Sequence, residues 1–316
     1  MYCFGIDVGG TTVKCGLFQT DGTLVEKWEI PTRKENKGEY ILPDVAETIQ
    51  NKISEKGIDK AEVAGVGVGI PGPINAQGEA ACAVNLYWGF RPVAKELSEL
   101  TGLTAKAGND ANVAALGEAW RGAAAGSQNV IMVTLGTGVG GGIISDGRIV
   151  AGAHGAGGEI GHITVDPEGF ECTCGKRGCL ETVSSATGVV RLGRYLAEEY
   201  AGDSKLKAML DNGEEVTSKD IFEMAQEDDP FALMVVDRVC FYLGLACGNL
   251  GNTLNPSSIV LGGGVSAAGE FLRSRVEKYF KEFTFPQVRE STKIKLAELG
   301  NEAGVIGAAS LALKFA

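Results

Sequence analysis

The sequence lacks several features that would place it in common classes of protein. Its formal net charge is −11, so it has no basic excess of the kind that binding to nucleic acid or to an anionic membrane surface rewards. No apolar run reaches the length of a membrane span, and the longest candidate, residues 239–250, fits a buried helix better. Residues 1–10 have no basic segment before an apolar stretch and are typical of a strand, so we expect no signal peptide and a cytoplasmic protein.

Two familiar phosphate-binding motifs are also missing. No GxxxxGK[ST] loop is present, and no GxGxxG is followed by a helix. An acidic chain can nevertheless bind ATP, because phosphate sites use local backbone amides and a metal ion. Histidine is scarce, with two residues in the chain; we expect His154 to be structural or a loop residue.

The composition indicates an ordinary soluble globular protein. The chain has 316 residues, 44% of them apolar and 22% charged, which suggests two domains that each bury a core. Of eight cysteines, three lie close together and five are scattered: Cys3, Cys15, Cys82, Cys240 and Cys247. This distribution favours reduced thiols and one metal cluster over a disulfide framework.

The chain contains an internal repeat. Residues 4–30 and residues 130–152 each have an apolar strand, a Gly/Thr turn, a second strand, an Asp-Gly turn and a third strand. Asp21-Gly22 and Asp146-Gly147 are hairpin signals between extended runs. A period this long indicates duplicated domains rather than a solenoid.

Helices and further strands separate and follow the two repeats. Helical spacing of apolar residues predicts helices over residues 44–56, 111–122, 188–200 and 229–254, a helix from about 269, and a closing helix from 305. Strands are predicted at residues 63–70, at 103–108 and at 257–262. The mixture predicts an α/β fold of two lobes with a cleft between them.

Three Gly-rich turns follow apolar strands. They are DVGGTTVK at residues 7–14, LGTGVGGG at 135–142 and LGGGVS at 261–266. Consecutive Gly and Thr amides can point at phosphate oxygens, and Asp7 at a strand end could hold Mg²⁺. A plain Gly hairpin with a surface Asp is the alternative for the first turn alone, but the matching turn in the second repeat favours a clamp for a nucleoside triphosphate.

Residues 159–181 carry the most specific pattern in the chain. This stretch contains a Cys₃His set within 18 residues: His162, Cys172, Cys174 and Cys179. Such a set without an open position is typical of a tetrahedral structural zinc site. The alternative is three reduced thiols beside an unrelated histidine.

Acidic residues lie on both sides of this cluster, and another lies at residue 110, where a predicted strand is followed by a helix. Glu159 precedes His162 by three residues and Glu181 follows Cys179 by two, so a metal would fix both acids on one loop; solvated surface carboxylates are the alternative. Asn109-Asp110 lies between a strand and a helix. Local sequence favours a helix N-cap there, although a general base could occupy the same corner.

Taken together, these motifs resemble the ROK family of repressors, open reading frames and kinases, over essentially the whole chain. The resemblance rests on DVGGTTVK, GIPGPI, GNDANVAALGE, LGTGVGGGII, HGAGGEIGH, CTCGKRGCLE and LGGGVS. It implies an actin/hexokinase-like (ribonuclease H-like) fold with duplicated β-meander domains and an interlobe cleft. The lobes would comprise residues 1–108 plus 301–316, with the last helix returning to the N-terminal lobe, and residues 109–300 with the zinc loop.

Within the family, the motifs are most similar to those of bacterial glucose kinases. The implied reaction is transfer of the γ-phosphoryl group of ATP, with Mg²⁺, to the 6-hydroxyl of glucose. Asp110 would be the catalytic base, and the sugar hydroxyls would be held by Asn85, Asn109, Asp110, Glu159, His162 and Glu181. The nucleotide would be bound by Asp7, Gly9, Gly10, Thr11, Thr12, Lys14, Gly136, Thr137, Gly138, Gly262, Gly263 and Gly264, and zinc by His162, Cys172, Cys174 and Cys179.

Other activities remain open at this point. A kinase for fructose, mannose, N-acetylmannosamine or N-acetylglucosamine is the main alternative. A sugar-responsive repressor would need an N-terminal helix-turn-helix, for which Asp7 leaves no room, and a basic surface. An actin- or chaperone-like ATPase would not explain the zinc loop. Family resemblance implies a homodimer that takes glucose and ATP and binds neither nucleic acid nor membrane.

Overall fold

The computed structural model describes residues 1–313, which form two compact units. Unit 1 comprises residues 1–130, 142–158 and 298–313, and unit 2 comprises residues 131–141 and 159–297. These divisions differ from the predicted lobe boundaries at 108/109 and 300/301, because helix α4 (Asp110–Arg121) packs against helix α12 (Ala303–Leu313) within unit 1. The two lobes themselves stay a prediction. Residues 314–316, which the prediction assigned to the N-terminal lobe, lie outside the described residues.

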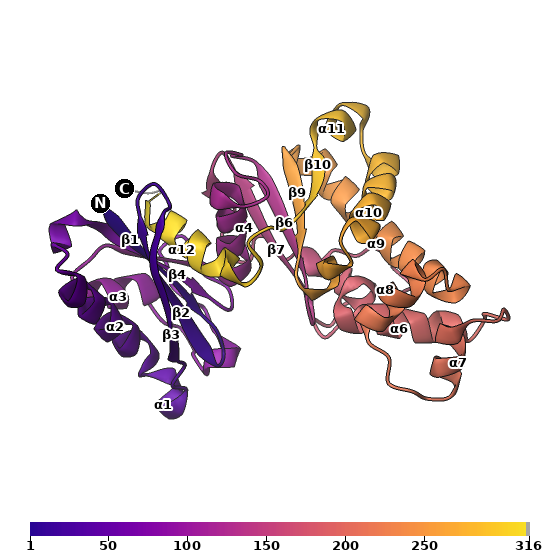
Figure 1. The fold of residues 1–316 in the computed structure, drawn as a ribbon, viewed down its shortest axis with the longest axis horizontal. Helices are drawn as coiled ribbons and strands as arrows, with labels where there is room; N and C mark the ends of the chain where they lie inside the picture. Colours follow the sequence, from indigo (N-terminus) through magenta and orange to yellow (C-terminus); the bar gives the residue numbers. More distant parts are fainter. Residues whose placement is uncertain (314–316) are drawn as a thin grey trace. The chain divides into compact units, whose positions relative to one another are not determined.

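Unit 1 is built on a five-stranded sheet of order β3-β2-β1-β4-β5; Figure 1 labels its first four strands. Its strands are β1 (Tyr2–Val8), β2 (Thr12–Gln19), β3 (Leu24–Pro31), β4 (Val63–Ile70) and β5 (Ala105–Asn109). The first three form the antiparallel meander of the first repeat, and β4 and β5 add in parallel. The single turn α1 (Glu35–Gly38) and the helices α2 (Ile41–Lys56) and α3 (Val93–Thr101) connect them.

Alternating side chains of β1 cover two different cores, as the two-residue period of a strand requires. Phe4 and Ile6 lie in a cluster with Ile41 and Ile49 of α2. Cys3, on the opposite face, packs with Ala309 of α12. The closing helix therefore packs on the first sheet.

Helix α12 approaches this sheet and α4 so closely that glycine is required at the contacts. A Cβ on Gly67 of β4 would lie 1.8 Å from the carbonyl oxygen of Ala308, and a Cβ on Gly307 would lie 1.7 Å from that of Val113. No side chain can replace the hydrogen at either position without moving backbone.

The second sheet has the order β10-β9-β6-β7-β8, which repeats the order of the first. Its strands are β6 (Val130–Leu135), β7 (Val139–Ser145), β8 (Arg148–Ile149), β9 (Ser258–Gly262) and β10 (Lys293–Leu296). In both sheets the meander comes first and two further strands follow on the side of its first strand, so the predicted duplication is confirmed. The third strand of the second repeat is only two residues long, since the backbone leaves the sheet before Gly152, whose φ is +73°.

The two Asp-Gly hairpin signals act through different backbone geometry. Asp146 and Gly147 both have positive φ, 48° and 73°, as a two-residue type I′ turn requires. At the first hairpin only Gly22 has positive φ, and Asp21 accepts the N–H of Thr23 instead.

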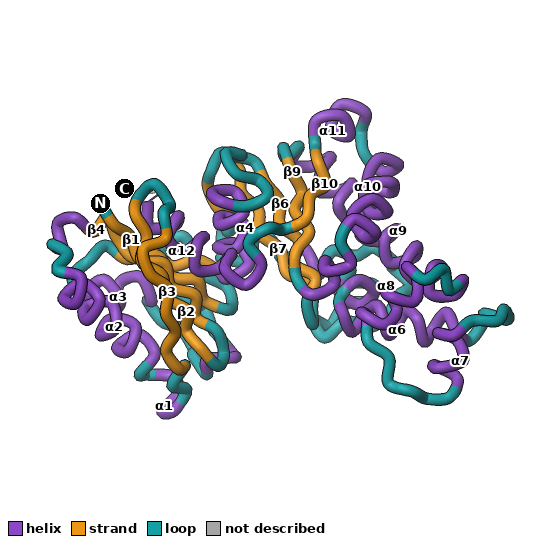
Figure 2. Tube along the Cα trace, viewed as in Figure 1, coloured by secondary structure: helices purple, strands orange, loops and turns teal. Residues whose placement is uncertain are grey.

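Unit 2 is largely helical (Figure 2). Its helices are α5 (Glu181–Ser184), α6 (Ala186–Ala197), α7 (Lys205–Asp211), α8 (Ser218–Gln226), α9 (Pro230–Leu254), α10 (Glu270–Phe283) and α11 (Pro286–Ser291). Helix α9 lies at their centre and contacts α6, α8 and α10.

Among residues 1–313, α9 is the one helix long and apolar enough to cross a membrane by length and composition. Its most apolar window is 67% buried within the fold, as in the core helix of a globular protein. The prediction of a buried helix in this segment is confirmed, and the helix is weak evidence for a membrane.

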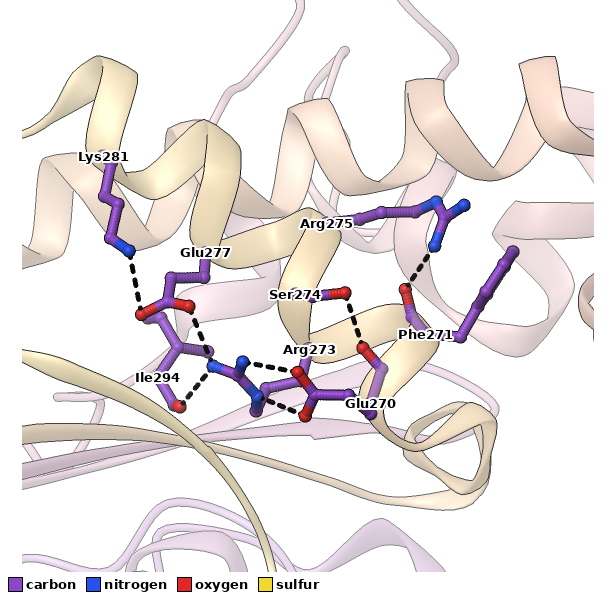
Figure 3. A network of polar contacts seen from close by, with 8 residues as sticks. All are labelled: Glu270, Phe271, Arg273, Ser274, Arg275, Glu277, Lys281 and Ile294. Carbon is purple, nitrogen blue, oxygen red and sulfur yellow. Dashed lines mark hydrogen bonds and ion pairs between the residues drawn. The ribbon is translucent and has the colours of Figure 1, made fainter. Parts of the chain in front are cut away.

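Arg273 ties α10 to the edge of the second sheet (Figure 3). Its guanidinium donates to both carboxylate oxygens of Glu270 at 2.6 Å and to Glu277 at 3.1 Å. A further bond at 3.3 Å reaches the carbonyl oxygen of Ile294 in β10. Because the side chain is only 23% exposed, this network is screened less than a surface ion pair.

Candidate metal centre and active-site residues

The predicted Cys₃His set forms a cluster in unit 2. The ligand atoms of His162, Cys172, Cys174 and Cys179 all lie within 4.8 Å of one another. Cys174 Sγ is 3.7 Å from Cys179 Sγ, and Cys172 Sγ is 3.6 Å from Nδ1 of His162. A tetrahedral zinc ion with ordinary bond lengths separates two sulfurs by about 3.8 Å and a sulfur and a nitrogen by about 3.5 Å. The donors thus fit zinc in both chemistry and spacing.

The loop that carries the cysteines is shaped by its own backbone bonds. Cys172 N–H donates to the carbonyl oxygen of Lys176, and Gly175 N–H donates back to that of Cys172. The backbone N–H of Lys176 holds the pKa of the Cys174 thiol below its ordinary value, while burial raises the pKa of Cys179 to about 12. A thiol with a raised pKa needs a bound cation to become a thiolate near neutral pH.

Glu181 connects this cluster to the second Gly/Thr turn. Its Oε2 accepts the backbone N–H of Val139 at 3.1 Å, and its Oε1 lies 3.9 Å from Cys172 Sγ. A Cβ on Gly138 would be 2.3 Å from Oε2, so a larger residue there would displace the carboxylate. Beside it lies a cavity of about 260 Å³ that is lined by Thr137, Gly138, Glu171, Cys172, Thr173, Glu181, Thr182, Thr187 and Arg191.

Glu159 lies one turn from the metal cluster. It occupies the position before the short 3₁₀ turn Ile160–His162, and its carbonyl oxygen accepts the N–H of His162 at 3.1 Å. The side chain of Glu159 is exposed. His162 turns Nδ1 toward Cys172, which leaves Nε2 for another partner.

Two of the three Gly-rich turns come together in unit 2. Gly263, after β9, has φ +84°, and a Cβ there would lie 2.6 Å from the backbone nitrogen of Leu135 at the end of β6. A cavity of about 170 Å³ begins at Gly264 and is lined by Ser218, Lys219, Phe222, Glu223, Gln226, Val265, Ala267 and Ala268. The turn at 261–266 therefore borders a partly apolar hollow and contacts the end of β6.

Helix α6 supports the second turn in a way that the motifs did not indicate. Ala186 N–H donates to the carbonyl oxygen of Gly136 at 2.8 Å, and the Thr187 hydroxyl donates to that of Thr137 at 3.1 Å. Ser185 caps the helix by accepting the N–H of Gly188. The Ser-Ser-Ala-Thr run before an apolar helix is an N-cap signal that could have predicted the helix start, but not its contact with the turn.

The first turn, in unit 1, is a closed loop at the end of β1. Gly9 N–H donates to the carbonyl oxygen of Thr12 at 3.0 Å, and the Thr32 hydroxyl donates to that of Gly9 at 2.8 Å. Thr11 and Thr12 are exposed, so their hydroxyls are accessible. Lys14 donates to the carbonyl oxygen of Asn301 at 3.1 Å, which joins the turn to the segment before α12.

Asp7 is a half-buried carboxylate within this part of the fold. Burial raises its pKa above the ordinary value, the nearby charge of Lys14 lowers it, and that of Asp110 raises it. Asp7, Lys14 and Asp110 therefore lie close enough to interact. A site with two carboxylates and one lysine gains from a bound cation.

The structure separates the roles of the Asn109-Asp110 pair. Asn109 is the N-cap of α4, since its Oδ1 accepts the N–H of Asn112 at 3.1 Å. Asp110 is the first helical residue; its Oδ1 accepts from Ala111 N–H at 2.8 Å and from Asn109 Nδ2 at 2.9 Å. Asp110 is exposed, so the capping interpretation applies to Asn109 and leaves the Asp110 carboxylate accessible.

Gly72, a residue that sequence reasoning missed, links Asn109 to the segment that precedes Asn85. Asn109 Nδ2 donates to the carbonyl oxygen of Gly72 at 3.1 Å. Gly72, at φ +115°, packs against the backbone of Cys82 and Ala83, where a Cβ would be 2.4 Å from the Cys82 oxygen. The exposed Asn85 follows two residues later. The Pro-Gly-Pro turn was predicted as a turn, but only the fold reveals that it joins these two segments.

These elements define the class of protein. Two sheets of identical strand order, each opening with a meander and a Gly/Thr turn, form the architecture shared by actin- and hexokinase-like proteins. A search against family models matches the ROK family over residues 3–315. The chain belongs to the ROK family, and the predicted family and fold class are both confirmed.

Individual relatives cover nearly the whole chain. A glucokinase of Halalkalibacterium halodurans is 46% identical over 305 residues, which are 96% of this chain and 92% of the relative. The crystal structure of the ROK hexokinase from Thermus thermophilus is 32% identical, with a TM-score of 0.81 over 98% of this chain and 97% of the other. A ROK family glucokinase from Streptomyces griseus, in complex with glucose and AMPPNP, is 30% identical, with a TM-score of 0.71 over 98% and 99%.

Proposed function

We propose that this protein is a glucokinase that transfers the γ-phosphoryl group of ATP to the 6-hydroxyl of glucose. The observation that carries the proposal is the similarity to glucokinases along almost the entire chain. The ATP-dependent sugar kinase expected from the sequence agrees with this similarity and with the complex of glucose and AMPPNP in a relative. The main alternative is a kinase for another hexose or an N-acetylhexosamine.

The nucleotide is held by the three Gly-rich turns. In unit 2, Gly136, Thr137, Gly138 and the turn at 262–264 direct backbone amides toward the phosphates, and the hollow beside Gly264 suits the base. In unit 1, the amides and hydroxyls of residues 9–12 and the ammonium of Lys14 have the same role. Asp7 would hold Mg²⁺, which neutralises charge on the phosphates when it is bound.

Asp110 acts as the base. Phosphoryl transfer has a loose transition state, so the main task of the protein is to place the acceptor hydroxyl in line and to take its proton late. The Asp110 carboxylate is oriented by the Asn109 amide and by Ala111 N–H, both on Oδ1, and would accept the proton of the 6-hydroxyl. Asn109 would bond a neighbouring sugar hydroxyl.

The remaining sugar contacts come from two regions. Asn85 lies beyond the Gly72 corner, while Glu159, His162 and Glu181 lie around the metal cluster. Carboxylate, amide and imidazole groups accept from and donate to hydroxyls. A zinc ion bound by His162, Cys172, Cys174 and Cys179 would be structural, because it would fix the backbone that carries Glu159 and Glu181.

The physiological setting is part of the same proposal. A glucokinase acts in glycolysis in the cytoplasm, and a homodimer follows from the family resemblance. The net charge of −11 favours neither nucleic acid nor anionic membranes as partners.

The test is a comparison of kcat/KM for glucose, mannose, fructose, N-acetylglucosamine and N-acetylmannosamine with ATP and Mg²⁺. Glucose is expected to give the highest value, because a site built around hydroxyls rejects analogues that leave its buried polar groups unpaired. A higher kcat/KM for another sugar in the panel would replace glucose as the substrate, while turnover of no sugar at all would contradict the kinase.

A further inference from the structure

Glu118 is a buried acidic residue that the proposed reaction does not use. It lies in helix α4, about two turns after Asp110, and its exposed fraction is 0%. Among residues 1–313 it is the one Asp, Glu, Lys or Arg that is fully buried. Burial of an ionised carboxylate is costly unless hydrogen bonds replace its hydration, so its partners indicate what it does in the fold.

Three backbone N–H groups donate to the Glu118 carboxylate. Its Oε2 accepts the N–H of Ala123 at 2.8 Å, just after the end of α4. Its Oε1 accepts the N–H of Leu299 at 2.9 Å and that of Glu298 at 3.1 Å. Hydrogen bonds to an ionised acceptor are stronger than bonds between neutral groups, so Glu118 fixes residues 298–299 beside the end of α4.

The segment that Glu118 holds is the place where the chain enters unit 1 for the last time. Unit 2 ends at Ala297, and Glu298 is the next residue of unit 1. A Cβ on Gly122 would lie 2.1 Å from Oε2 of Glu118 and 2.9 Å from Cγ of Leu299, so the segment is packed closely against the end of α4. The position of the backbone after residue 297 therefore depends on this carboxylate.

The same segment contacts the two charged residues that we assign to the phosphates and to Mg²⁺. Lys14 Nζ donates to the carbonyl oxygen of Asn301 at 3.1 Å, and an ammonium group keeps two further donors for phosphate oxygens. Gly304, in the first turn of α12, lies against Asp7, since a Cβ there would be 2.5 Å from Oδ2 of that carboxylate. The segment thus connects the end of α4 to both groups.

We infer that Glu118 is a positioning residue for the nucleotide. Through residues 298–304 it sets the places of the Lys14 ammonium and the Asp7 carboxylate, and it contacts neither ATP nor sugar itself. The inference rests on the proposed function, because Lys14 and Asp7 have to act on the phosphates and on Mg²⁺.

Glutamine at residue 118 would have nearly the same shape but could not make the same bonds. Both carboxylate oxygens accept N–H groups, whereas an amide has one oxygen and an NH₂ group that donates. Glu118→Gln therefore turns a donor toward the N–H of Ala123 or toward those of Glu298 and Leu299. At least one backbone N–H then has no acceptor inside the fold, and the segment moves away from α4.

Steady-state kinetics of the whole enzyme distinguishes positioning from a general loss of structure. Glu118→Gln should raise the KM for MgATP by about fivefold or more and leave the KM for glucose close to the wild-type value. Ile49→Ala is the control for lost stability, because it leaves a cavity in the core on the opposite face of the first sheet. Its KM for MgATP should equal that of wild type.

Two kinetic outcomes would overturn the inference. One is a wild-type KM for MgATP in Glu118→Gln. The other is an equal rise of this KM in Ile49→Ala, which would assign the effect to stability.

Gly304→Ala tests the link from its other end and remains available if Glu118→Gln does not fold. Alanine is favoured over glycine within a helix, and the added Cβ meets the end of the Asp7 side chain, which can rotate away. The Mg²⁺ concentration for half-maximal rate should rise about fivefold or more. Gly193→Ala in helix α6, where a Cβ would have ordinary contacts of 3.5 Å or more, should keep the wild-type value. An unchanged Mg²⁺ requirement in Gly304→Ala would contradict the role of the segment.

Failure of the proposed function can be told apart from failure of this inference. An enzyme that phosphorylates no sugar would contradict the proposed function. Calorimetric titration with MgATP would still test Glu118, because the Kd for MgATP should rise in Glu118→Gln as the KM does. Equal Kd values for wild type and Glu118→Gln would overturn the inference and leave the kinase in place.

Discussion

The carboxylate of Glu181 accepts the backbone N–H of Val139 at 3.1 Å, across 42 residues of sequence. One oxygen thereby holds the second Gly/Thr turn while the other lies 3.9 Å from Cys172 Sγ. The zinc loop and the proposed phosphate turn therefore share a single side chain, and a change at one affects the geometry of the other.

Glu181→Gln should raise the KM for glucose by about tenfold or more, with little change in bound zinc. The amide oxygen can still accept from Val139, but the negative charge that would receive a sugar hydroxyl is lost, and a hydrogen bond to a charged group contributes about 1.5–3 kcal/mol. Steady-state kinetics and elemental analysis measure both effects. Glu171→Gln on the same loop, where Glu171 pairs with Arg177 at the surface, is the matched control. An unchanged KM for glucose in Glu181→Gln would limit Glu181 to a structural role.

The protein should contain one zinc ion per chain. Cys174→Ser removes one of four donors, so the variant should lose the metal and, with the loop no longer fixed, also lose glucose binding. Elemental analysis of untagged protein and glucose titration test this, with Cys82→Ser, an exposed cysteine outside the cluster, as control. Wild-type protein without stoichiometric metal would disprove the site.

Asp110→Asn should remove nearly all turnover and leave glucose and ATP binding largely intact. Asparagine keeps the shape and the acceptor that Asn109 and Ala111 use, but it cannot take a proton. Asp146→Asn, in a hairpin turn where asparagine tolerates the positive φ of 48°, should be fully active. If Asp110→Asn kept more than roughly a tenth of wild-type kcat, a loss below about 1.4 kcal/mol, another group would be the base.

Asp7→Asn should stabilise the enzyme at neutral pH when no metal or nucleotide is present. Burial raises the pKa of Asp7 above its ordinary value of 3.8, so the native state binds more protons than the unfolded state between these two pKa values. Stability contributed by this group is therefore greatest in acid and falls as pH rises through that window. Denaturant unfolding from pH 3.5 to 8 should show wild type losing stability relative to Asp7→Asn, and the variant should be inactive. The exposed Asp203→Asn should follow wild type; equal pH profiles for Asp7→Asn and wild type would contradict the burial of the charge.

Arg273→Ala should lower the free energy of unfolding by about 1–2 kcal/mol. The substitution removes three carboxylate bonds and one bond to β10, and it leaves Glu270 and Glu277 facing each other without the cation. Urea unfolding at low salt measures the loss, which should shrink in 1 M salt. Arg275→Ala on the same helix loses one hydrogen bond, to the carbonyl oxygen of Phe271, and a contact with the Phe271 ring, and should cost less. A salt-independent loss in Arg273→Ala would assign the effect to packing.

The sequence alone determined the features whose parts are close together in the chain. The Cys₃His set lies within residues 162–179, the strand-turn-strand pattern repeats at residues 4–30 and 130–152, and both Asp-Gly turns follow from local backbone preference. Spacing and residue chemistry specify these because few conformations can satisfy them over so short a distance. Asn109 and Asp110 show the limit of this reasoning, since either could cap the helix until the structure assigned the cap to Asn109.

Only the tertiary structure decided which distant segments share a site. Packing of α12 on the first sheet placed α4, and with it Asp110, in unit 1, because glycines such as Gly307 allow backbone to approach backbone. The bond from Val139 to Glu181, the contact of Gly263 with Leu135 and a cavity that joins residues 74–78, 105–112 and 148–151 all depend on chain reversals through the two sheets. Such contacts leave no local signal in the sequence. The packing of whole helices and strands brings these segments together, and the residues in contact contribute only a small part of the buried surface.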